Sequence, residues 1–308
     1  MTRITSNVGA RPLSWADARP WWLARAGDFL ELTKPRIVAL ELVTIVAAYH
    51  LASPRGIDLG VLWPTLIGAA LVAASAGALN QWLEQASDSR MERTANRPLP
   101  AGRLSSRQVV AFGMVTLVAG TAIVVHWIGF LTAAIALATW LIYVAAYTPL
   151  KRRSPLNTAV GAVSGALPIL IGWTAAGAMV DMRAWALVAA MFLWQFPHFM
   201  AIAWLYRDDY ARGGQRMLTV VDPTGLRAAA QAVAAALVLV PVSLVPALSP
   251  QAGSPALFCW WTLLLGVGQA ATAVLFLVER DERSARRLLR ASLLYLTCWM
   301  GLLVMVAV

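Results

Sequence analysis

The chain has 308 residues, of which 59% are hydrophobic and only 13% are charged, and its mean hydropathy is +0.66. A soluble domain carries about a quarter charged residues, so this chain lacks the polar surface that would keep it in water. The formal net charge is +10, but the basic residues lie in short segments between apolar runs, as topology signals of membrane proteins do. The composition therefore predicts a protein of the lipid bilayer and no nucleic-acid partner.

Apolar runs long enough to cross a bilayer as a helix, which takes roughly 20 residues, recur along the chain. The run at 106–148 is too long for one crossing, and we divide it at His126-Trp127, which interrupts it. The sequence thus predicts an all-α membrane protein with nine transmembrane helices. The expected spans are 36–52, 60–84, 106–125, 128–148, 156–178, 184–205, 228–248, 255–278 and 288–307.

The basic residues predict the orientation of these spans. If the N-terminus is cytoplasmic, then of the 25 Lys and Arg residues only Arg55 and Arg183 fall in segments on the outer side. Because Lys and Arg concentrate on the cytoplasmic side of membrane proteins, this partition favours a cytoplasmic N-terminus. We divide the chain into a cytoplasmic or interfacial N-terminal arm, residues 1–35, and a membrane domain, residues 36–308.

Four polar residues around the end of the second span recur every four positions: Asn80, Glu84, Asp88 and Glu92. This spacing places them along one face of a helix. Such a face should line a cavity between helices, because exposing it to lipid is costly. Oxygen ligands at this spacing suit Mg²⁺, which one or two carboxylates hold together with phosphate oxygens and water. We therefore take Asn80, Glu84 and Asp88 as metal-binding and catalytic candidates.

Basic side chains suited to a diphosphate accompany this stripe. Arg93 and Arg97 follow it directly, and arginine makes bidentate contacts with phosphate. A second group, Tyr147, Lys151 and Arg152, lies at the cytoplasmic end of the fourth span. Together they predict a Mg²⁺-dependent site for a lipid diphosphate at the cytoplasmic face. The alternatives are an ordinary loop with solvated charge pairs for the first group and a topology signal for the second.

A third group lies in and after the sixth span. His198 is about ten residues inside the membrane from Asp208, and an imidazole at that depth is a functional candidate. The alternative is a structural hydrogen bond to a neighbouring helix.

Four motifs follow one another along the chain. They are Asn80, Glu84, Asp88, Met91, Arg93, Thr94 and Arg97-Pro98-Leu99, then Tyr147, Thr148, Lys151 and Arg152, then Asn157, Gly161, Gly165, Ala166 and Pro168, and last Trp194-Gln195, Pro197-His198-Phe199 and Asp209-Tyr210-Ala211-Arg212. These motifs resemble the intramembrane aromatic prenyltransferases of the UbiA type, and within them the protohaem IX farnesyltransferase (haem O synthase) branch. The similarity runs from Leu32-Thr-Lys-Pro-Arg-Ile37 to the ninth span. Members of this superfamily have nine transmembrane helices around a central cavity.

The resemblance implies that the farnesyl group of farnesyl diphosphate is transferred to the 2-vinyl group of haem B, that water adds, and that haem O and diphosphate are released. It implies Mg²⁺ as cofactor and a place in the cell (inner) membrane with the site facing the cytoplasm. Haem A synthase or a terminal-oxidase assembly factor are candidate protein partners. Arg93 and Lys151 are expected to be catalytic. Arg97, Tyr147, Arg152, His198, Asp209 and Tyr210 are expected to bind substrate.

Two other functions stay open on the sequence. A quinone-type aromatic prenyltransferase is disfavoured by Glu84 and by the Pro197-His198-Phe199 motif. A transporter would show internal repeats and helices broken at mid-membrane, whereas the charge here collects at one face. The segment Asp208-Asp209-Tyr210 also lacks the second pair of spaced aspartates usual in the ring prenylators, so the sequence does not establish a second metal site.

Overall fold

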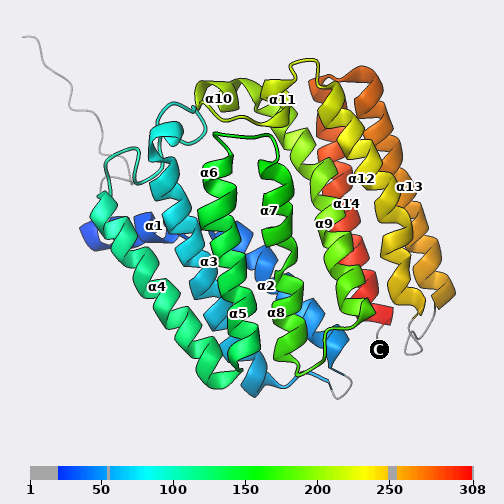
Figure 1. Cartoon of the computed structure of the whole chain (residues 1–308), viewed down its shortest axis with the longest axis horizontal. Coiled ribbons are helices and arrows are strands. Elements are labelled where there is room, and N and C mark those ends of the chain that lie inside the picture. The colour runs from blue at the N-terminus through cyan, green and yellow to red at the C-terminus, as the bar shows by residue number, and fades with distance from the viewer. Residues whose placement is uncertain (1–19, 54–55, 249–254, 307–308) are drawn as a thin grey trace, which may run out of the picture.

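A computed structural model describes residues 20–53, 56–248 and 255–306, and every regular element within these ranges is a helix (Figure 1). Nine of the helical segments in the described ranges are long and apolar enough to cross a membrane, which confirms the predicted fold class. They are α2 (Pro35–Ala52), α3 (Leu59–Asp88), α4 (Ser106–Trp127), α5 (Phe130–Leu141) continued by a π-helix (Ile142–Tyr147) and α6 (Thr148–Leu150), α7 (Asn157–Ala166) with α8 (Pro168–Ala175), α9 (Met182–Leu205), α12 (Leu226–Leu244) with a 3-10 turn (Val245–Leu248), α13 (Pro255–Glu279) and α14 (Glu282–Val306).

Local sequence signals explain where these helices begin and end. Ser105 and Gln108 form a capping box at the start of α4, and Asp181 accepts hydrogen bonds from two backbone N–H groups at the start of α9. Helix α4 ends at Trp127, and Gly129, with φ +135°, turns the chain into α5. The predicted division of the 106–148 run is therefore confirmed.

Helices α3 and α4 pack closely because small residues face each other. A Cβ added at Gly120 would lie 2.7 Å from the backbone oxygen of Gly68, and one at Gly68 would lie 2.4 Å from Val124. Small residues let membrane helices approach until backbone and side chain are in van der Waals contact. This packing holds the helices together, because there is no hydrophobic driving force between helices in lipid. This contact fixes α3, the helix that carries the polar stripe.

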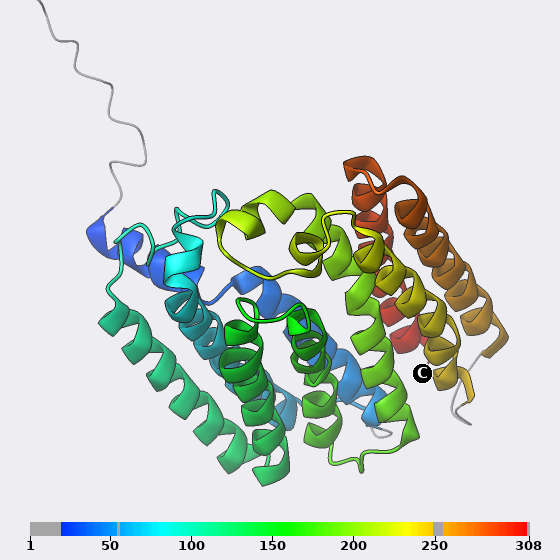
Figure 2. The ribbon, with the colours of Figure 1, turned by 45° about the horizontal axis from the view of Figure 1, so that its top comes forward.

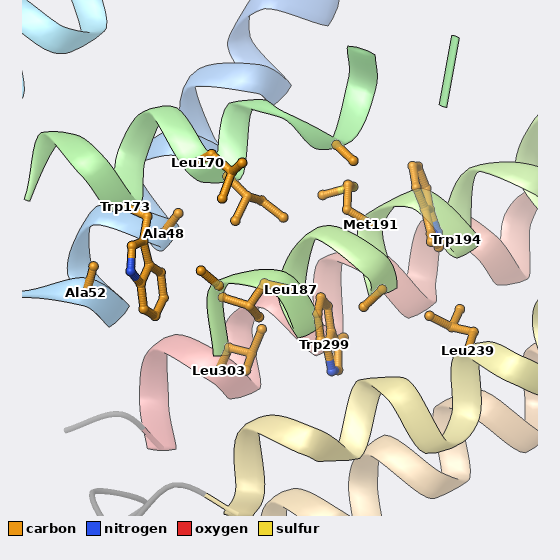
Figure 3. Close-up of a cluster of buried hydrophobic side chains, with 14 of the residues drawn as sticks. Ala48, Ala52, Leu170, Trp173, Leu187, Met191, Trp194, Leu239, Trp299 and Leu303 are labelled. Carbon is orange, nitrogen blue, oxygen red and sulfur yellow. The ribbon is translucent and has the colours of Figure 1, made fainter. Parts of the chain in front are cut away.

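A cluster of buried apolar side chains fills the bundle between α2, α8, α9, α12 and α14 (Figure 3). Trp173 and Trp299 are each 1% exposed, and their rings lie among Ala48, Ala52 and Leu303. On α9 the cluster reaches as far as Trp194. Beyond Trp194, α9 carries two polar side chains, Gln195 and His198, and then a second apolar cluster around Met200 and Trp204. One end of the bundle is thus closed by apolar packing.

The connections that carry the predicted site residues meet at the other end of the bundle, which is at the top of Figure 1 and is turned towards the viewer in Figure 2. They are the loop after α3, the turn between α6 and α7, and the segment with α10 (Arg207–Arg212) and α11 (Leu218–Val221). Helix α1 (Trp21–Leu32) lies across the bundle axis near this end and packs Phe29 on Phe112. The rest of the predicted arm, residues 1–19, lies outside the described residues.

Two predicted spans are shorter than the helices that contain them. Helix α3 continues past residue 84 to Asp88, as the stripe predicts, and α14 begins at Glu282 rather than 288. In α14 the charged side chains lie on one face and Ala285 and Leu288 are fully buried on the other, so the helix begins before its apolar run does. Helix α3 does not reach Glu92, which stands in a turn with its side chain exposed, so Glu92 is not the fourth member of one helical stripe.

The orientation gives a testable prediction. We expect single cysteines at exposed Ser89 and Arg153 to resist a membrane-impermeant thiol reagent in intact cells and to react after permeabilisation, because both stand at the end rich in Lys and Arg. The background is a variant in which Cys259 and Cys298 are replaced by alanine. A cysteine at Met179, exposed at the opposite end, is the control and should react in intact cells. Labelling of residue 89 or 153 from outside would reverse the orientation.

A buried ionic cluster as candidate active site

The three predicted residues at the end of α3 are buried. Asn80, Glu84 and Asp88 are 0%, 5% and 1% exposed. A buried carboxylate is strongly disfavoured unless cations or hydrogen-bond donors compensate it. The three predicted residues therefore lie on one helix and face into the protein, and other segments must supply their partners.

Glu84 is compensated by Lys151, which lies in the turn after α6. The Lys151 Nζ is 3.0 Å from Oε1 and 3.1 Å from Oε2 of Glu84, and the Asn80 amide donates to Oε2 at 2.9 Å. Burial alone would lower the pKa of Lys151, but the Glu84 carboxylate outweighs it, and the pKa is raised above its ordinary value. Lys151 is thus a permanent cation beside the stripe.

A second cation in this cluster, Lys34, was not singled out from the sequence. Its Nζ donates to Asn80 Oδ1 at 2.6 Å and to the Tyr143 hydroxyl at 3.3 Å. Lys34 caps the start of α2 with φ +53°, a left-handed conformation that costs a residue with a side chain about 1–3 kcal/mol and is often found at functional sites. The sequence gives one local sign of this backbone conformation. Pro35 disfavours the right-handed helical region for the residue before it, Lys34.

Asp88 pairs with Arg97 from the loop that follows α3. Arg97 Nη1 donates to Asp88 Oδ2 at 2.6 Å. The other carboxylate oxygen, Oδ1, is buried and accepts no hydrogen bond from any described residue. The loop is held back on the helix by the Thr94 hydroxyl, which donates to the Asp88 backbone oxygen at 3.0 Å. A free, buried carboxylate oxygen suits an additional cationic ligand.

The π-helical segment Ile142–Tyr147 places two aromatic side chains beside the lysines. Such segments are frequent at functional sites, because the extra residue per turn shifts side chains out of helical register. The Tyr147 ring centroid is 4.6 Å from the Lys151 Nζ, and the Tyr143 ring is 5.3 Å from that of Tyr147. Gly161 leaves the space for the Tyr147 ring, since a Cβ at position 161 would lie 2.7 Å from that ring.

The segment around α10 closes the cluster from the α9 side. Gln215 Nε2 donates to Glu84 Oε1 at 3.4 Å, and Arg152 Nε donates to Ser87 Oγ at 3.1 Å. The Arg93 guanidinium lies over Tyr206 and Tyr210, at 5.3 and 5.9 Å from the ring centroids. The predicted residues Arg93, Arg152 and Tyr210 thus lie around the stripe, and Gln215 joins them as a residue that the sequence did not indicate.

Asp209 holds the loop after α3 in place. Its carboxylate accepts hydrogen bonds from the backbone N–H of Glu92 at 2.8 Å and of Arg93 at 3.4 Å, and from the Arg212 side chain at 2.9 Å. Burial acts to raise the pKa of Asp209, but these donors outweigh it and hold the pKa below its usual range. Asp209 contacts the backbone of the loop after α3. It would therefore act on substrate binding by holding that loop in position.

His198 stands apart from the ionic cluster. Its Nδ1 is 3.0 Å from the Ser292 hydroxyl of α14, and its ring stacks on Trp194 at 4.9 Å. Among the described residues no hydrogen bond to Nε2 is formed. The contact with Ser292 is the structural hydrogen bond that the sequence left as an alternative. The same contact orients the imidazole ring and leaves Nε2 available to a ligand. In histidines that bind metals, a hydrogen bond to the other ring nitrogen has this orienting role.

The donor set fits a Mg²⁺ ion that is held partly by its substrate. Among the described residues no group of three His, Cys, Asp or Glu side chains could hold a metal ion by itself. Glu84 and Asp88, one helical turn apart, supply the one or two carboxylates with which Mg²⁺ binds substrate phosphates, and Asp88 Oδ1 is free for it.

Comparison of the sequence with known proteins identifies the family of the chain. The UbiA prenyltransferase family matches residues 42–300. The chain belongs to this family. It is 43% identical over 289 residues to a protein of Solibacter usitatus named protoheme IX farnesyltransferase, with 90% of this chain and 98% of that protein covered. The mitochondrial protoheme IX farnesyltransferase of Arabidopsis thaliana is 38% identical over 300 residues, which cover 97% of this chain and 67% of that protein.

Solved structures of the family share the fold. A digeranylgeranylglyceryl phosphate synthase superimposes with a TM-score of 0.75 at 16% identity over 92% of this chain and 99% of the other. A UbiA homologue from Archaeoglobus fulgidus bound to GPP and Mg²⁺ has a TM-score of 0.64 at 16% identity, over 90% of this chain and 99% of the other. These likenesses establish the UbiA fold for the nine membrane helices of the described residues.

The role of Asp209 can be tested by hydrogen exchange. In Asp209→Asn we expect the amides of Glu92 and Arg93 to exchange at least about tenfold faster, because losing hydrogen bonds to a charged acceptor costs about 1.5–3 kcal/mol locally. Asp208→Asn, at an exposed neighbour with no hydrogen bond in the described structure, is the control. Since the folded-state pKa is lowered, the wild-type protection should be full above pH about 4 and lost as the pH falls through the folded pKa. Equal exchange in both variants would rule out this anchoring role.

Proposed function

We propose that the chain is a protohaem IX farnesyltransferase, which transfers the farnesyl group of farnesyl diphosphate to the 2-vinyl group of haem B and forms haem O with the addition of water. The observation that carries the proposal is the cluster of Lys34, Lys151 and Arg97 around the buried carboxylates Glu84 and Asp88. The similarity to proteins named protoheme IX farnesyltransferase over nine-tenths of the chain supports the choice of haem as acceptor over a quinone-type ring.

The cations of the cluster would bind the diphosphate. Lys34, Lys151 and Arg97 approach from three different segments, so they can contact the diphosphate from several sides, and arginine can do so with two parallel hydrogen bonds. Arg93 and Arg152 stand at the exposed rim, where they would attract the anion. Mg²⁺ held by Asp88 and Glu84 would neutralise charge on the leaving diphosphate. We place the site at the cytoplasmic face of the inner membrane, as the distribution of Lys and Arg favours.

The acceptor would lie deeper in the bundle, beside α9. His198 is seven residues before the end of α9, roughly 10 Å below it at 1.5 Å per residue. The diphosphate cluster lies at that end, so a haem held at His198 would bring its vinyl carbon below the diphosphate, next to the farnesyl C1. The apolar packing around Trp194 and Trp299 closes the far side and keeps bulk water from an allylic cation.

The proposal is tested by incubating membranes that contain the chain with haem B, farnesyl diphosphate and Mg²⁺, and separating the haems by chromatography. We expect haem O with the wild type and none after the metal is removed with a chelator. Asp88→Asn should lower turnover at least about 10²-fold, because neutralisation by a metal is worth several kcal/mol. Glu92→Gln is the matched control, since this carboxylate is exposed and lies off the helix. Prenylation of a phenolic ring acceptor without haem O would favour the quinone-type enzyme instead.

The role of His198 has a separate prediction. We expect His198→Ala to weaken haem B binding while farnesyl diphosphate affinity stays near the wild-type value, because the ring stands apart from the cationic cluster. Ser292→Ala, which removes the hydrogen bond that orients the ring, should weaken haem binding less. Two binding titrations on each purified variant measure this. Intact haem binding in His198→Ala, with normal turnover, would leave His198 with the structural hydrogen bond alone.

A further inference from the structure

A carboxylate that none of the motifs contains lies inside the membrane part of the bundle. Glu41 is on α2, seven residues after Lys34 and within a membrane-spanning helix. Seven residues are almost two helical turns, so Glu41 lies on the same face as Lys34 and roughly 10 Å deeper. An ionisable side chain at this depth is costly and is a functional candidate for that reason.

The face of α2 that carries Glu41 points into the bundle. Ile45 and Ala48, one and two turns deeper on this face, are 0% and 2% exposed. Ile45 packs on Ile171 of α8, and Ala48 contributes to the apolar cluster with Trp173. On the opposite face Leu40 and Val43 are 63% and 59% exposed, which fits contact with lipid.

Glu41 differs from the other carboxylates of the site in having no partner. Glu84 is paired with Lys151, and Asp88 with Arg97. Glu41 makes no hydrogen bond and no ion pair with any residue that the structure describes, and it is only partly buried. Its oxygens are therefore available to a small polar molecule at the depth where His198 would hold the haem.

We propose that Glu41 is the general base that takes a proton from the water added in the last step of the reaction. The inference rests on the proposed function. The farnesyl C1–O bond breaks with its electron pair going to the diphosphate, and the vinyl π electrons form the new bond to C1. This leaves a cation on the vinyl carbon attached to the porphyrin. The water oxygen forms a bond to this carbon, one of its O–H bonds breaks, and the proton passes to the Glu41 carboxylate.

The position of Glu41 suits this step better than that of the other carboxylates. Glu84 and Asp88 are paired with Lys151 and Arg97 at the proposed diphosphate site. A proton taken up by either carboxylate would remove the negative charge that balances its cation. A base one to two turns deeper is on the acceptor side of the farnesyl C1. It can hold a single water molecule by a charge-assisted hydrogen bond while the apolar end of the bundle excludes bulk water.

The test is product analysis of Glu41→Gln, which keeps shape and removes the base. We expect haem O formation to fall by about 10²-fold or more, the usual contribution of a general base. A farnesylated haem lighter by one water molecule should appear, because the cation then loses a proton from carbon to the diphosphate. Farnesyl diphosphate affinity should be unchanged, and Glu41→Asp should restore part of the haem O. Thr44→Val is the matched control, because Thr44 lies one turn deeper and bonds only to the backbone of Leu40.

Three other outcomes are decisive. Haem O at the wild-type rate from Glu41→Gln, with no dehydrated product, would overturn the proposal. Loss of farnesyl diphosphate binding in both Glu41→Gln and Glu41→Asp would assign Glu41 to folding and overturn it as well. Absence of any farnesylated haem from the wild-type chain would instead refute the proposed function, on which the role of Glu41 depends.

Discussion

The ion pair between Lys151 and Glu84 is the interaction on which the rest of the site depends. It joins α3 to the turn after α6 across 67 residues of sequence, at 3.0 Å and almost out of contact with solvent. At this separation two unit charges attract by several kcal/mol even at an effective dielectric constant of about 20. Removing one partner of a buried pair costs about 3–5 kcal/mol, because the other charge is left uncompensated. The two segments that bring the carboxylate and the cation together are therefore held in one arrangement.

The same charges that stabilise the cluster prepare it for an anionic substrate. Asn80 links the two lysines, since it accepts from Lys34 and donates to Glu84, which in turn accepts from Lys151. In the proposed function a diphosphate would contact the lysines, and Mg²⁺ would be held by the carboxylates. The buried charges would then be balanced with and without substrate, with little reorganisation of the side chains. This is the preorganisation that makes electrostatic stabilisation effective.

The sequence predicted the membrane helices because their signal is local. Length and apolarity identify each span in the described residues, and the interruption at His126-Trp127 falls at the end of α4 as expected. The stripe of Asn80, Glu84 and Asp88 was likewise found from its helical period. Glu92 was misplaced for a physical reason. Periodicity does not reveal that α3 ends at Asp88, because the Glu92 N–H, which would continue the helix, donates to the distant Asp209 carboxylate instead.

The residues that the sequence missed are those whose partners come from distant segments. Lys34 meets Asn80 across 46 positions and Gln215 meets Glu84 across 131, and neither contact leaves a period in the sequence. Glu41 was missed for the opposite reason, because a single carboxylate in an apolar run has no pattern.

The charged site residues lie at one end of the bundle, and the other end is apolar. The reaction uses water in one step only, the addition that follows farnesyl transfer. An allylic cation is destroyed by bulk water, so the apolar cluster around Trp173, Trp194 and Trp299 must exclude solvent from the far end. In the proposed function the charged residues at the near end would release a hydrated anion, which requires that they face the aqueous side. A site that must hydrate a cation deep in this bundle has to bring in water by a bound polar group rather than by an open channel. An unpartnered carboxylate on the inner face of α2, two turns below the diphosphate cluster, meets that requirement without opening the apolar core.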